Sequence, residues 1–336
     1  MNKFVKIGLI GYGRHMDHSM FPNIISNEAT EVVSVADISA ERIELIKHKI
    51  PGIKTYDSGD ALVTAAANDG LDAVVISLTP QGHLKYAELA LQAGLNVFVE
   101  KPVAINSIDL DPLIDVAEKH KLVTCVGTKW RYTKATKLAQ KLCFSQKKYL
   151  PRVITLEATF PHGLFKDNMW NLSNKTEMTY YDMFVHAFDY IESWIPGGNL
   201  INTKKIYDNG NTEVVSAEIS NKETTALLTL IRGTQQYGMQ FESVLENGAK
   251  LSMKNLTEIS LIDDNSWIGT EGSLRDQPTM KWQQGRLYRG YARAGYREEW
   301  DSFISAIQNG GDTPTNLKTA KLAIQKIESS LSVLSK

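Results

Sequence analysis

The sequence has 336 residues, more than one hydrophobic core usually accommodates, so we expect two domains, with a single large barrel as the competing architecture. Its 37 basic and 38 acidic side chains leave a net charge of −1, which excludes a strong overall field for nucleic acid or anionic lipid and favours small-molecule partners. Cys125 and Cys143 are too few for a disulfide framework, so we expect a reducing compartment, most simply the cytoplasm.

The first third of the chain alternates short apolar runs with helical patterns. Its N-terminal apolar stretch is too short for a signal peptide, and we see no run long enough to cross a bilayer, so we expect neither export nor membrane insertion. The alternation indicates βαβ units and a parallel sheet with helices on both faces, because such crossovers are right-handed. The expected strands are 4–10, 31–36, 73–77, 96–100 and 122–127, and the expected helices are 39–50, 81–93 and 107–120, with Gly94 ending the second of these helices.

A different pattern follows from about Arg152 to Ile262, where strand-like runs are joined by short turns. The expected strands are 153–160, 213–219, 224–231, 239–245, 250–253 and 257–262. Asn247-Gly248 between two of these runs predicts a type I′ hairpin turn. The second domain is therefore expected to contain an antiparallel sheet.

Two helices are expected at the C-terminal end. The first lies around Trp300 to Ile307 and ends at Gly310-Gly311. The second has one apolar stripe, with spacings of three and four residues, formed by Leu317, Ala320, Ile324, Ile327, Leu331 and Leu334. A stripe of this kind needs a surface to pack against. We predict two domains, 1–125 and 126–336, with both helices in the second.

A dinucleotide-binding turn is predicted directly after the first strand, in the segment Gly8-Leu-Ile-Gly11-Tyr-Gly13-Arg14-His15-Met16. Gly11 allows a tight turn, Gly13 lets the backbone approach a pyrophosphate, and the following helix offers unpaired N–H groups. Met16 stands where the usual fingerprint has a third small residue, so we expect this helix to pack on the strand more loosely or in another arrangement. Taken alone, such a string is also found in ordinary loops.

Asp37 ends the second expected strand, where an acidic side chain accepts hydrogen bonds from the adenosine ribose hydroxyls of a dinucleotide. Its carboxylate would repel the 2′-phosphate of NADP, so we expect NAD as the cofactor and NADP as the less favoured one. The alternative is a plain helix N-cap ahead of Ser39-Ala-Glu-Arg, a role that needs no cofactor.

Two polar segments stand where further parallel strands are expected to end. They are Ser77-Leu-Thr79-Pro80-Gln-Gly-His83 and Val99-Glu100-Lys101-Pro102, and the carboxyl ends of parallel strands are where open α/β sheets bind ligands. Farther along the chain lie Gly127-Thr-Lys129-Trp-Arg131 and Asp182-Met-Phe-Val-His186-Ala-Phe-Asp189. In this order and spacing the four segments resemble the Gfo/Idh/MocA family of nicotinamide-dependent oxidoreductases, and the resemblance covers nearly the whole chain.

The resemblance implies an α/β Rossmann domain, then an α+β domain built on a large open, mainly antiparallel sheet, and a site between the two. Lys101 would lie beside the nicotinamide, hydrogen-bond the reacting hydroxyl and offset the negative charge that develops on its oxygen. Its alternative is a solvated lysine at a strand end. We expect no metal, and a cofactor site containing Gly11, Gly13, Arg14, His15, Met16, Asp37, Thr79, Pro80, His83, Glu100, Lys101 and Arg131.

Asp182 and His186 are four residues apart, so on a helix they share one face and can act on one substrate. An imidazole titrates near neutrality, which suits His186 to remove the hydroxyl proton, while Asp182 would hold the substrate or orient the other catalytic groups. The alternative is an Asp-His pair that only satisfies itself at a surface. The family often has glycine at the position of Phe184, whose ring would either narrow the pocket or turn to the sheet.

Aromatic residues are expected to line the substrate side, because aromatic faces beside a few polar groups suit a sugar or cyclitol ring. The aromatic and polar candidates are Trp170, His162, Asn171 and the stretch Trp282 to Tyr296. By resemblance, we also expect a homodimer or homotetramer formed through the C-terminal sheet.

The expected function is hydride transfer between NAD and a secondary alcohol of a sugar, sugar derivative or cyclitol, with Lys101, Asp182 and His186 as catalytic residues. One alternative is an NAD-dependent glycosidase that oxidises its substrate transiently. Another is a non-catalytic nicotinamide-binding sensor, which would have no need of Lys101 and His186. Neither the sugar nor the direction of the reaction follows from the sequence.

Overall fold

The computed structural model describes residues 4–161, 170, 172, 174–263, 280–285 and 294–334. The chain divides into two compact units, Met1–Lys129 with Gly295–Gln325, and Trp130–Ala294 with Lys326–Lys336. This division differs from the expected domains, 1–125 and 126–336, because helix α9 (Tyr296–Asn309) and the first half of α10 (Leu317–Leu334) group with the first unit.

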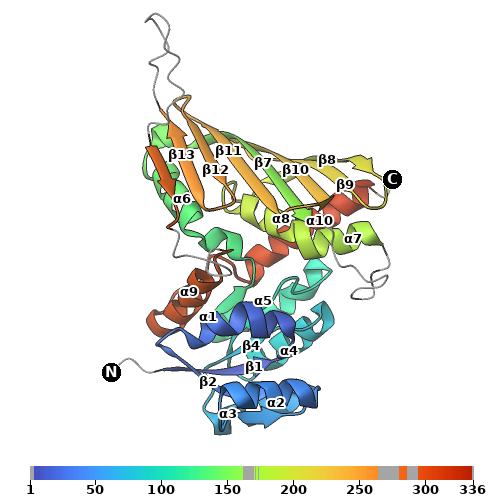
Figure 1. Ribbon diagram of the computed structural model, residues 1–336, viewed down its shortest axis with the longest axis vertical. Coiled ribbons are helices and arrows are strands. Elements are labelled where there is room, and N and C mark those ends of the chain that lie inside the picture. Colours follow the sequence, from blue (N-terminus) through green and yellow to red (C-terminus); the bar gives the residue numbers. More distant parts are fainter. Residues whose placement is uncertain are drawn as a thin grey trace, which may run out of the picture. The chain divides into compact units, whose positions relative to one another are not determined.

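The first unit contains a parallel sheet of six strands within the described residues (Figure 1). In sheet order they are β3 (Lys54–Tyr56), β2 (Thr30–Ala36), β1 (Val5–Ile10), β4 (Ala73–Ile76), β5 (Asn96–Val99) and β6 (Thr124–Val126). The strand order reverses between β1 and β4, and ligands of such sheets bind at this reversal. The expected Rossmann architecture is confirmed.

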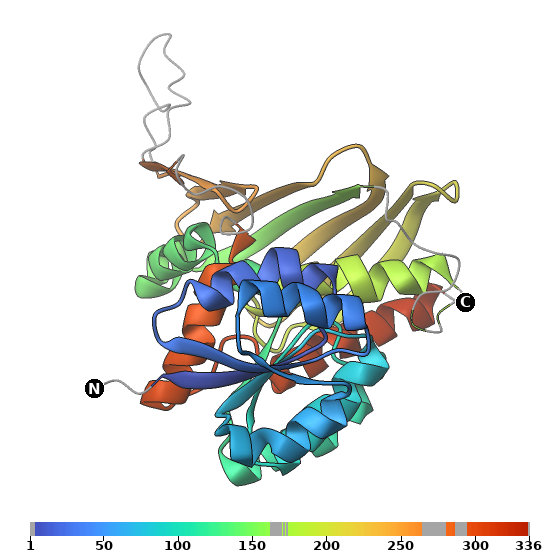
Figure 2. The same ribbon diagram turned by 60° about the horizontal axis from the view of Figure 1, so that its bottom comes forward.

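Helices lie on both faces of the six-stranded sheet (Figure 2). They are η1 (Met16–Met20), α1 (Phe21–Ile25), α2 (Ala40–Lys49), α3 (Gly59–Asp69), α4 (Pro80–Gln92), η2 (Ser107–Leu110), α5 (Asp111–His120) and α9. Gly94 follows the end of α4 with φ of +79°, as expected of a residue that stops a helix. Neither β3 nor α3 was predicted, since β3 has only three residues and no apolar run.

Helix α9 belongs to the first unit because of its aromatic face. The rings of Trp300 and Phe303 lie 5.8 and 5.7 Å from that of Phe98 on β5, and all three side chains are almost fully buried. The indole N–H of Trp300 also donates to the Thr30 hydroxyl, at 3.1 Å. The sequence pattern predicted this helix correctly but gave no sign of which sheet it covers.

The second unit contains a sheet of eight described strands, mainly antiparallel as expected (Figure 1). In sheet order they are β14 (Met280–Gln283), β13 (Glu258–Ile262), β12 (Lys250–Lys254), β11 (Gly238–Leu245), β7 (Pro151–Pro161), β10 (Thr225–Thr234), β9 (Glu213–Ser220) and β8 (Asn199–Asp208). Only the β7–β10 pair is parallel. Strands β8 and β14, both at sheet edges, were not predicted.

One hairpin differs from its prediction. Between β11 and β12 the positive φ is confined to Gly248, at +82°, and Asn247 is not among the left-handed residues, so the predicted type I′ turn at Asn247-Gly248 is wrong. The N–H of Gly248 donates to the carbonyl of Leu245 at 2.9 Å, which makes a type I turn followed by a left-handed glycine. The next hairpin has the type I′ backbone, with φ of +49° at Asn255 and +55° at Leu256.

The helices of the second unit are η3 (Lys129–Tyr132), which begins one residue before the unit, α6 (Lys134–Ser145), η4 (Lys147–Tyr149), α7 (Lys175–Thr179), η5 (Tyr180–Phe184) and α8 (Val185–Glu192), besides the end of α10. Figure 1 shows α6, α7 and α8 on one face of the eight-stranded sheet. Along β7 the side chains alternate accordingly, with Ile154, Leu156 and Ala158 buried and Val153 42% exposed.

Candidate active site

The turn after β1 has the geometry expected of a dinucleotide-binding turn. Gly11 has φ of +86°, and a Cβ there would lie 2.5 Å from the carbonyl oxygen of Ser77, so only glycine fits. A Cβ on Gly13 would meet nothing within 4 Å, which leaves open space in front of its backbone. Open space beside a glycine at the reversal point of the sheet fits a cofactor whose pyrophosphate approaches the main chain.

Met16 explains how the helix after this turn packs without a third small residue. Its side chain is fully buried, and the helix begins as a π turn over Met16–Met20. A π turn holds one more residue than an α turn, so the chain here departs from regular α-helical geometry. Arg14 and His15, by contrast, are exposed.

The carboxylate of Asp37 holds the glycine turn against the end of β2. Its Oδ2 accepts the N–H of Tyr12 at 2.7 Å, and its Oδ1 accepts the N–H of Ser39 at 2.8 Å. The N-cap of α2 is Ser39, whose hydroxyl accepts the N–H of Arg42, so the alternative interpretation of Asp37 as the N-cap itself does not hold.

A hollow of about 600 Å³ adjoins Asp37 in the first unit. Its lining includes three acidic side chains, Asp37, Glu44 and Asp57, and one basic side chain, Lys47, whose ammonium pairs with Glu44 at 2.8 Å. Acidic groups outnumber basic ones among the residues that line this hollow.

His83 joins the segments that follow β4 and β5. Its Nε2 accepts the N–H of Leu78 at 2.9 Å, and its Nδ1 donates to the carbonyl of Pro102 at 2.8 Å. Burial lowers the pKa of His83 to about 4, so the ring is neutral at pH 7. Thr79 caps α4 with its hydroxyl, and Pro80 occupies the first turn. These three residues shape the sheet edge, and His83 has no ring nitrogen left for proton transfer.

Glu100 is a buried, ionised carboxylate beside Lys101. Its Oε1 lies 3.2 Å from Nε2 of His15, and its Oε2 accepts the N–H of Lys101 at 3.2 Å. Burial would raise the pKa of Glu100, but His15, Lys101 and Lys129 outweigh burial and hold it at about 2. A Cβ at Gly127 would lie 2.7 Å from Oε1, so glycine is required to make room for the carboxylate.

Two further residues lie at this edge: Lys129, which was not predicted as a site residue, and Tyr296, which was expected only as the last residue of the substrate-side stretch Trp282 to Tyr296. The ammonium of Lys129 lies 4.5 Å from the ring centre of Tyr296, and the same ring lies 5.9 Å from that of His15. Tyr296 comes from α9, far along the chain, and only the position of Lys129 after the last strand of the sheet hinted at its place. Basic side chains thus gather around the carboxylate of Glu100, next to Lys101.

In the second unit, Asp182 and His186 lie on one continuous helical segment formed by α7, η5 and α8. Asp182 is half-buried in the π turn, and His186 is buried, at 7% exposure, in the first turn of α8. Helical π turns often mark functional sites. Phe184, between the two, is fully buried and its ring lies 5.8 Å from that of Phe160 on β7, so it turns to the sheet.

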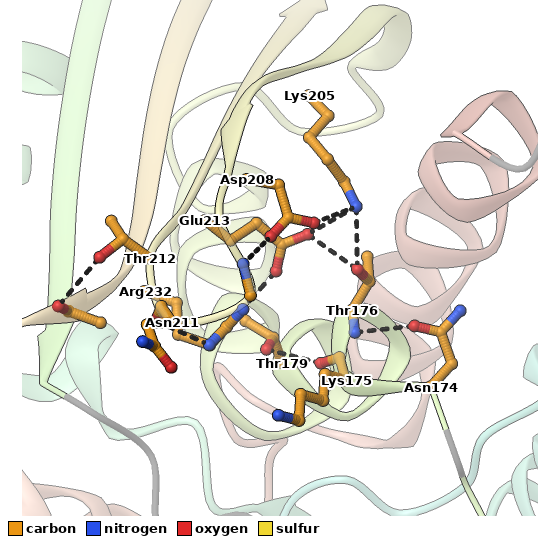
Figure 3. Close-up of polar contacts among 12 residues, drawn as sticks. Asn174, Lys175, Thr176, Thr179, Lys205, Asp208, Asn211, Thr212, Glu213 and Arg232 are labelled. Carbon is orange, nitrogen blue, oxygen red and sulfur yellow. Dashed lines mark hydrogen bonds and ion pairs between the residues drawn. The ribbon is translucent and has the colours of Figure 1, made fainter.

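A buried ionic cluster fixes the start of this helical segment (Figure 3). Glu213 of β9 is fully buried and accepts the hydroxyl of Thr176 at 2.8 Å. Lys205 lies 3.2 Å from one oxygen of Glu213 and Arg232 lies 3.4 Å from the other. Lys205 also donates to Thr176 at 3.1 Å. The Glu213 carboxylate therefore contacts side chains from β8, β10 and α7.

Two buried ion pairs fix the other end of the segment. Arg131 makes a two-pronged contact with Asp189, with Nε 2.8 Å from Oδ2 and Nη2 2.6 Å from Oδ1. Lys326 pairs with Glu192 at 2.6 Å, and all four side chains are at most 8% exposed. Arg131 was expected at the cofactor. That role stays a prediction; within the second unit its guanidinium neutralises the buried Asp189.

Other expected substrate residues are only partly described. Trp170 is half-buried with φ of +58°. His162, Asn171 and residues 286–293 of the stretch Trp282 to Tyr296 lie outside the described residues, so their roles stay predictions. Among the residues that are described, no group of His, Cys, Asp and Glu side chains could hold a metal ion. No helix in the described ranges is long and apolar enough to cross a membrane.

The sequence is similar to a family of oxidoreductases and to two inositol dehydrogenases. Residues 5–128 match a family model described as an oxidoreductase family with an NAD-binding Rossmann fold. The chain is 22% identical over 320 residues to an inositol 2-dehydrogenase of Pseudomonas savastanoi pv. phaseolicola, covering 91% of this chain and 87% of the relative. It is 20% identical over 330 residues to a myo-inositol 2-dehydrogenase of Thermotoga maritima, covering 95% and 93%.

Solved structures show the same fold over nearly the full chain. A dehydrogenase from Chromobacterium violaceum superposes with a TM-score of 0.87 at 23% identity, covering 99% of this chain and 96% of the other. The UDP-N-acetylglucosamine 3-dehydrogenase of Acidithiobacillus ferrooxidans superposes with a TM-score of 0.76 at 18% identity, covering 98% of each chain. Both similarities extend over at least 98% of this chain, so they concern its fold as a whole.

Proposed function

We propose that this chain, whose residues 5–128 match the family model, is a member of the Gfo/Idh/MocA family of oxidoreductases. Its proposed activity is that of an NAD-linked dehydrogenase that oxidises a secondary alcohol of a cyclitol, a sugar or a sugar derivative. The observation that carries this proposal lies in the first unit. A glycine turn with open space before Gly13, and Lys101 beside the ionised Glu100, both follow parallel strands of one sheet.

The proposed chemistry divides between the bound cofactor and three side chains. NAD, when bound, supplies the acceptor for the hydride that leaves the substrate carbon with the electron pair of the C–H bond. His186 takes the hydroxyl proton as the C=O bond forms. Lys101 donates a hydrogen bond to that oxygen and offsets its developing negative charge. Asp182 holds the substrate hydroxyls or orients the other two groups.

NAD rather than NADP is supported by the charge at the end of β2. Asp37 already accepts two backbone N–H groups, and the adjoining hollow is bordered by Glu44 and Asp57. Each carboxylate raises the energy of a 2′-phosphate placed there. We expect kcat/KM to be higher with NAD. Equal or better use of NADP would overturn this part of the proposal.

The substrate class is supported by the names of the relatives, which include inositol 2-dehydrogenases and a UDP-N-acetylglucosamine 3-dehydrogenase. We further propose a homodimer or homotetramer formed through the C-terminal sheet, of which one face carries α6, α7 and α8 (Figure 1). Analytical ultracentrifugation tests this assembly, and a monomer at micromolar concentration would contradict it.

The function itself is tested with a panel of inositols, aldoses, uronic acids and nucleotide sugars. We expect absorbance of reduced cofactor to appear with at least one of them and NAD, in stoichiometric yield with an oxidised product. Cleavage of a nitrophenyl glycoside without accumulation of NADH would instead assign the chain to the glycosidase alternative. Tight NAD binding with neither activity would favour a sensor.

A further inference from the structure

Trp130 lies against the residue that we propose as the base. Its indole stacks on the His186 imidazole, with ring centres 5.4 Å apart and planes 18° from parallel. Phe160 is nearly parallel to the same indole at 6.2 Å, while Tyr190 and Tyr237 meet it edge-on at 5.9 and 6.3 Å. Trp130 is only 3% exposed. Rings on several sides therefore fix the plane of the indole.

The backbone on both sides of this stack is also fixed. Arg131, the next residue after Trp130, forms the buried two-pronged ion pair with Asp189. Asp189 follows His186 by three residues on α8, so it lies on the same side of the helix. The ion pair thus sets the separation between Trp130 and α8, and the stack sets the tilt of the imidazole.

We propose that Trp130 is a positioning residue for the reaction, holding the imidazole of His186 in one plane and presenting an aromatic face to the imidazolium formed after proton transfer. The inference deepens the proposed function and rests on it. A flat aromatic face attracts a cation through its quadrupole, most strongly for tryptophan. Because the ring is fixed before the reaction, no reorganisation is needed when the charge appears.

The charged and titratable groups around the stack determine the expected direction of the pH effect. Asp182 and Asp189 on the helical segment favour the imidazolium, and Arg131 pairs with Asp189 and offsets it. Burial raises the pKa of Tyr190, so its hydroxyl stays neutral. Tyr237 contributes a ring edge. Replacing Trp130 by leucine removes the aromatic face but keeps an apolar neighbour, so the imidazolium loses stabilisation and the pKa of His186 falls.

The experiment compares Trp130→Leu and Trp130→Phe with a matched control, Trp194→Leu. Trp194 is also buried in the second unit, at 2% exposure, with its ring 4.6 Å from Phe241 and 6.2 Å from Tyr190. We expect Trp130→Leu to lower kcat about tenfold and to move the acidic limb of the kcat/KM profile about 0.5 pH units lower. Trp130→Phe should recover most of kcat, and Trp194→Leu should leave the limb in place.

A double-substitution cycle with His186→Asn tests whether Trp130 acts through the imidazole. If it does, Trp130→Leu has little further effect on kcat once His186 is replaced. Independent losses that multiply, or identical pH profiles for Trp130→Leu and Trp194→Leu, would overturn the inference and leave Trp130 a core residue. Full activity of His186→Asn would overturn the role of His186 as the base and the inference with it, whereas absence of NADH formation by the wild type with the whole substrate panel would contradict the proposed function, so the two failures are distinguishable.

Discussion

The two groups of candidate catalytic residues are held in different ways. In the first unit, the glycine turn and the segments carrying His83, Glu100 and Lys101 all lie at the ends of parallel strands, where backbone hydrogen bonds set their places. In the second unit, the segment with Asp182 and His186 is not part of the sheet. Buried ion pairs hold it instead, one at Glu213 (Figure 3) and one between Asp189 and Arg131.

This difference predicts which side-chain substitutions each unit accepts without loss of stability. A residue held by backbone geometry can lose its side chain while its neighbours stay in place. A segment held by buried ion pairs depends on partners that must all be present, because removal of one leaves an uncompensated charge. Substitution of Lys101 in the first unit is therefore expected to change the chemistry with little loss of stability, whereas removal of an ion-pair partner in the second unit is expected to change both.

The largest expected effect is on catalysis by His186. His186→Asn should lower kcat about 10²- to 10⁴-fold with NAD affinity nearly unchanged, because a positioned base contributes that much. In the wild type, activity falls as pH drops through the pKa of the base, since imidazolium cannot accept the proton. This acidic limb should be absent in the variant. An unchanged kcat and an unchanged acidic limb would show that His186 is not the base. The control is His120→Asn, because His120 is an exposed histidine.

Arg131 tests how the second unit is held. Arg131→Leu leaves the carboxylate of Asp189 buried and unpaired, which should cost about 3–5 kcal/mol of unfolding free energy. Arg152→Leu is the matched control on β7, where the ion pair with Glu246 is on the surface and its loss should cost about 1 kcal/mol or less. Equal losses in urea unfolding would contradict the comparison. Adding Asp189→Leu should restore part of the stability.

Lys101 tests the first unit. Lys101→Ala should lower kcat roughly a hundredfold, as expected when one charge-stabilising donor is lost, while the melting temperature and NAD binding stay near wild type. Lys85→Ala is the control, because Lys85 is an exposed lysine on α4 of the same unit, paired with Asp60. A raised KM with normal kcat would mean that Lys101 only binds the substrate.

The smaller of the two expected stability effects is that of His83 on the loss of folding stability at acidic pH. Burial lowers the pKa of His83 to about 4 from an ordinary value near 6.5, so the unfolded chain binds more protons between these values. Its contribution to stability is complete above pH 6.5 and decreases as pH falls toward 4. His83→Gln should reduce the loss of unfolding free energy over this window by about 3 kcal/mol. A slope identical to wild type would argue against a buried neutral ring.

The sequence predicted the elements with strong patterns and missed those without one. All expected strands of both sheets are present, since each is an apolar run or an alternation. Strand β8 escaped prediction because it is a sheet edge on which Thr203 is the single buried residue among those of the strand. The grouping of α9 with the first unit escaped as well, because an apolar helical face does not say which sheet it covers.

Site prediction followed the same division. Gly11 and Lys101 could be predicted because a local motif places them at strand ends. The ion pairs that hold the helical segment with Asp182 and His186 could not be predicted. Glu213, Lys205 and Arg232 meet only because β8 and β10 both pair with β9. The sequence also did not predict the ion-pair partner of Arg131, because the motif that contains Arg131 does not specify one. That partner, Asp189, lies 58 residues away in the chain.

The central claim is that this chain transfers hydride from a substrate carbon to NAD. The most direct test uses the best substrate of the panel, deuterated at the carbon that bears the reacting hydroxyl, with NAD and the wild-type enzyme. Proton NMR of the reduced cofactor should show one deuterium at C4 of the nicotinamide for each molecule of oxidised product, and a slower initial rate than with the undeuterated substrate. Product formed without a reduced cofactor, or reduced cofactor without deuterium, would contradict the claim.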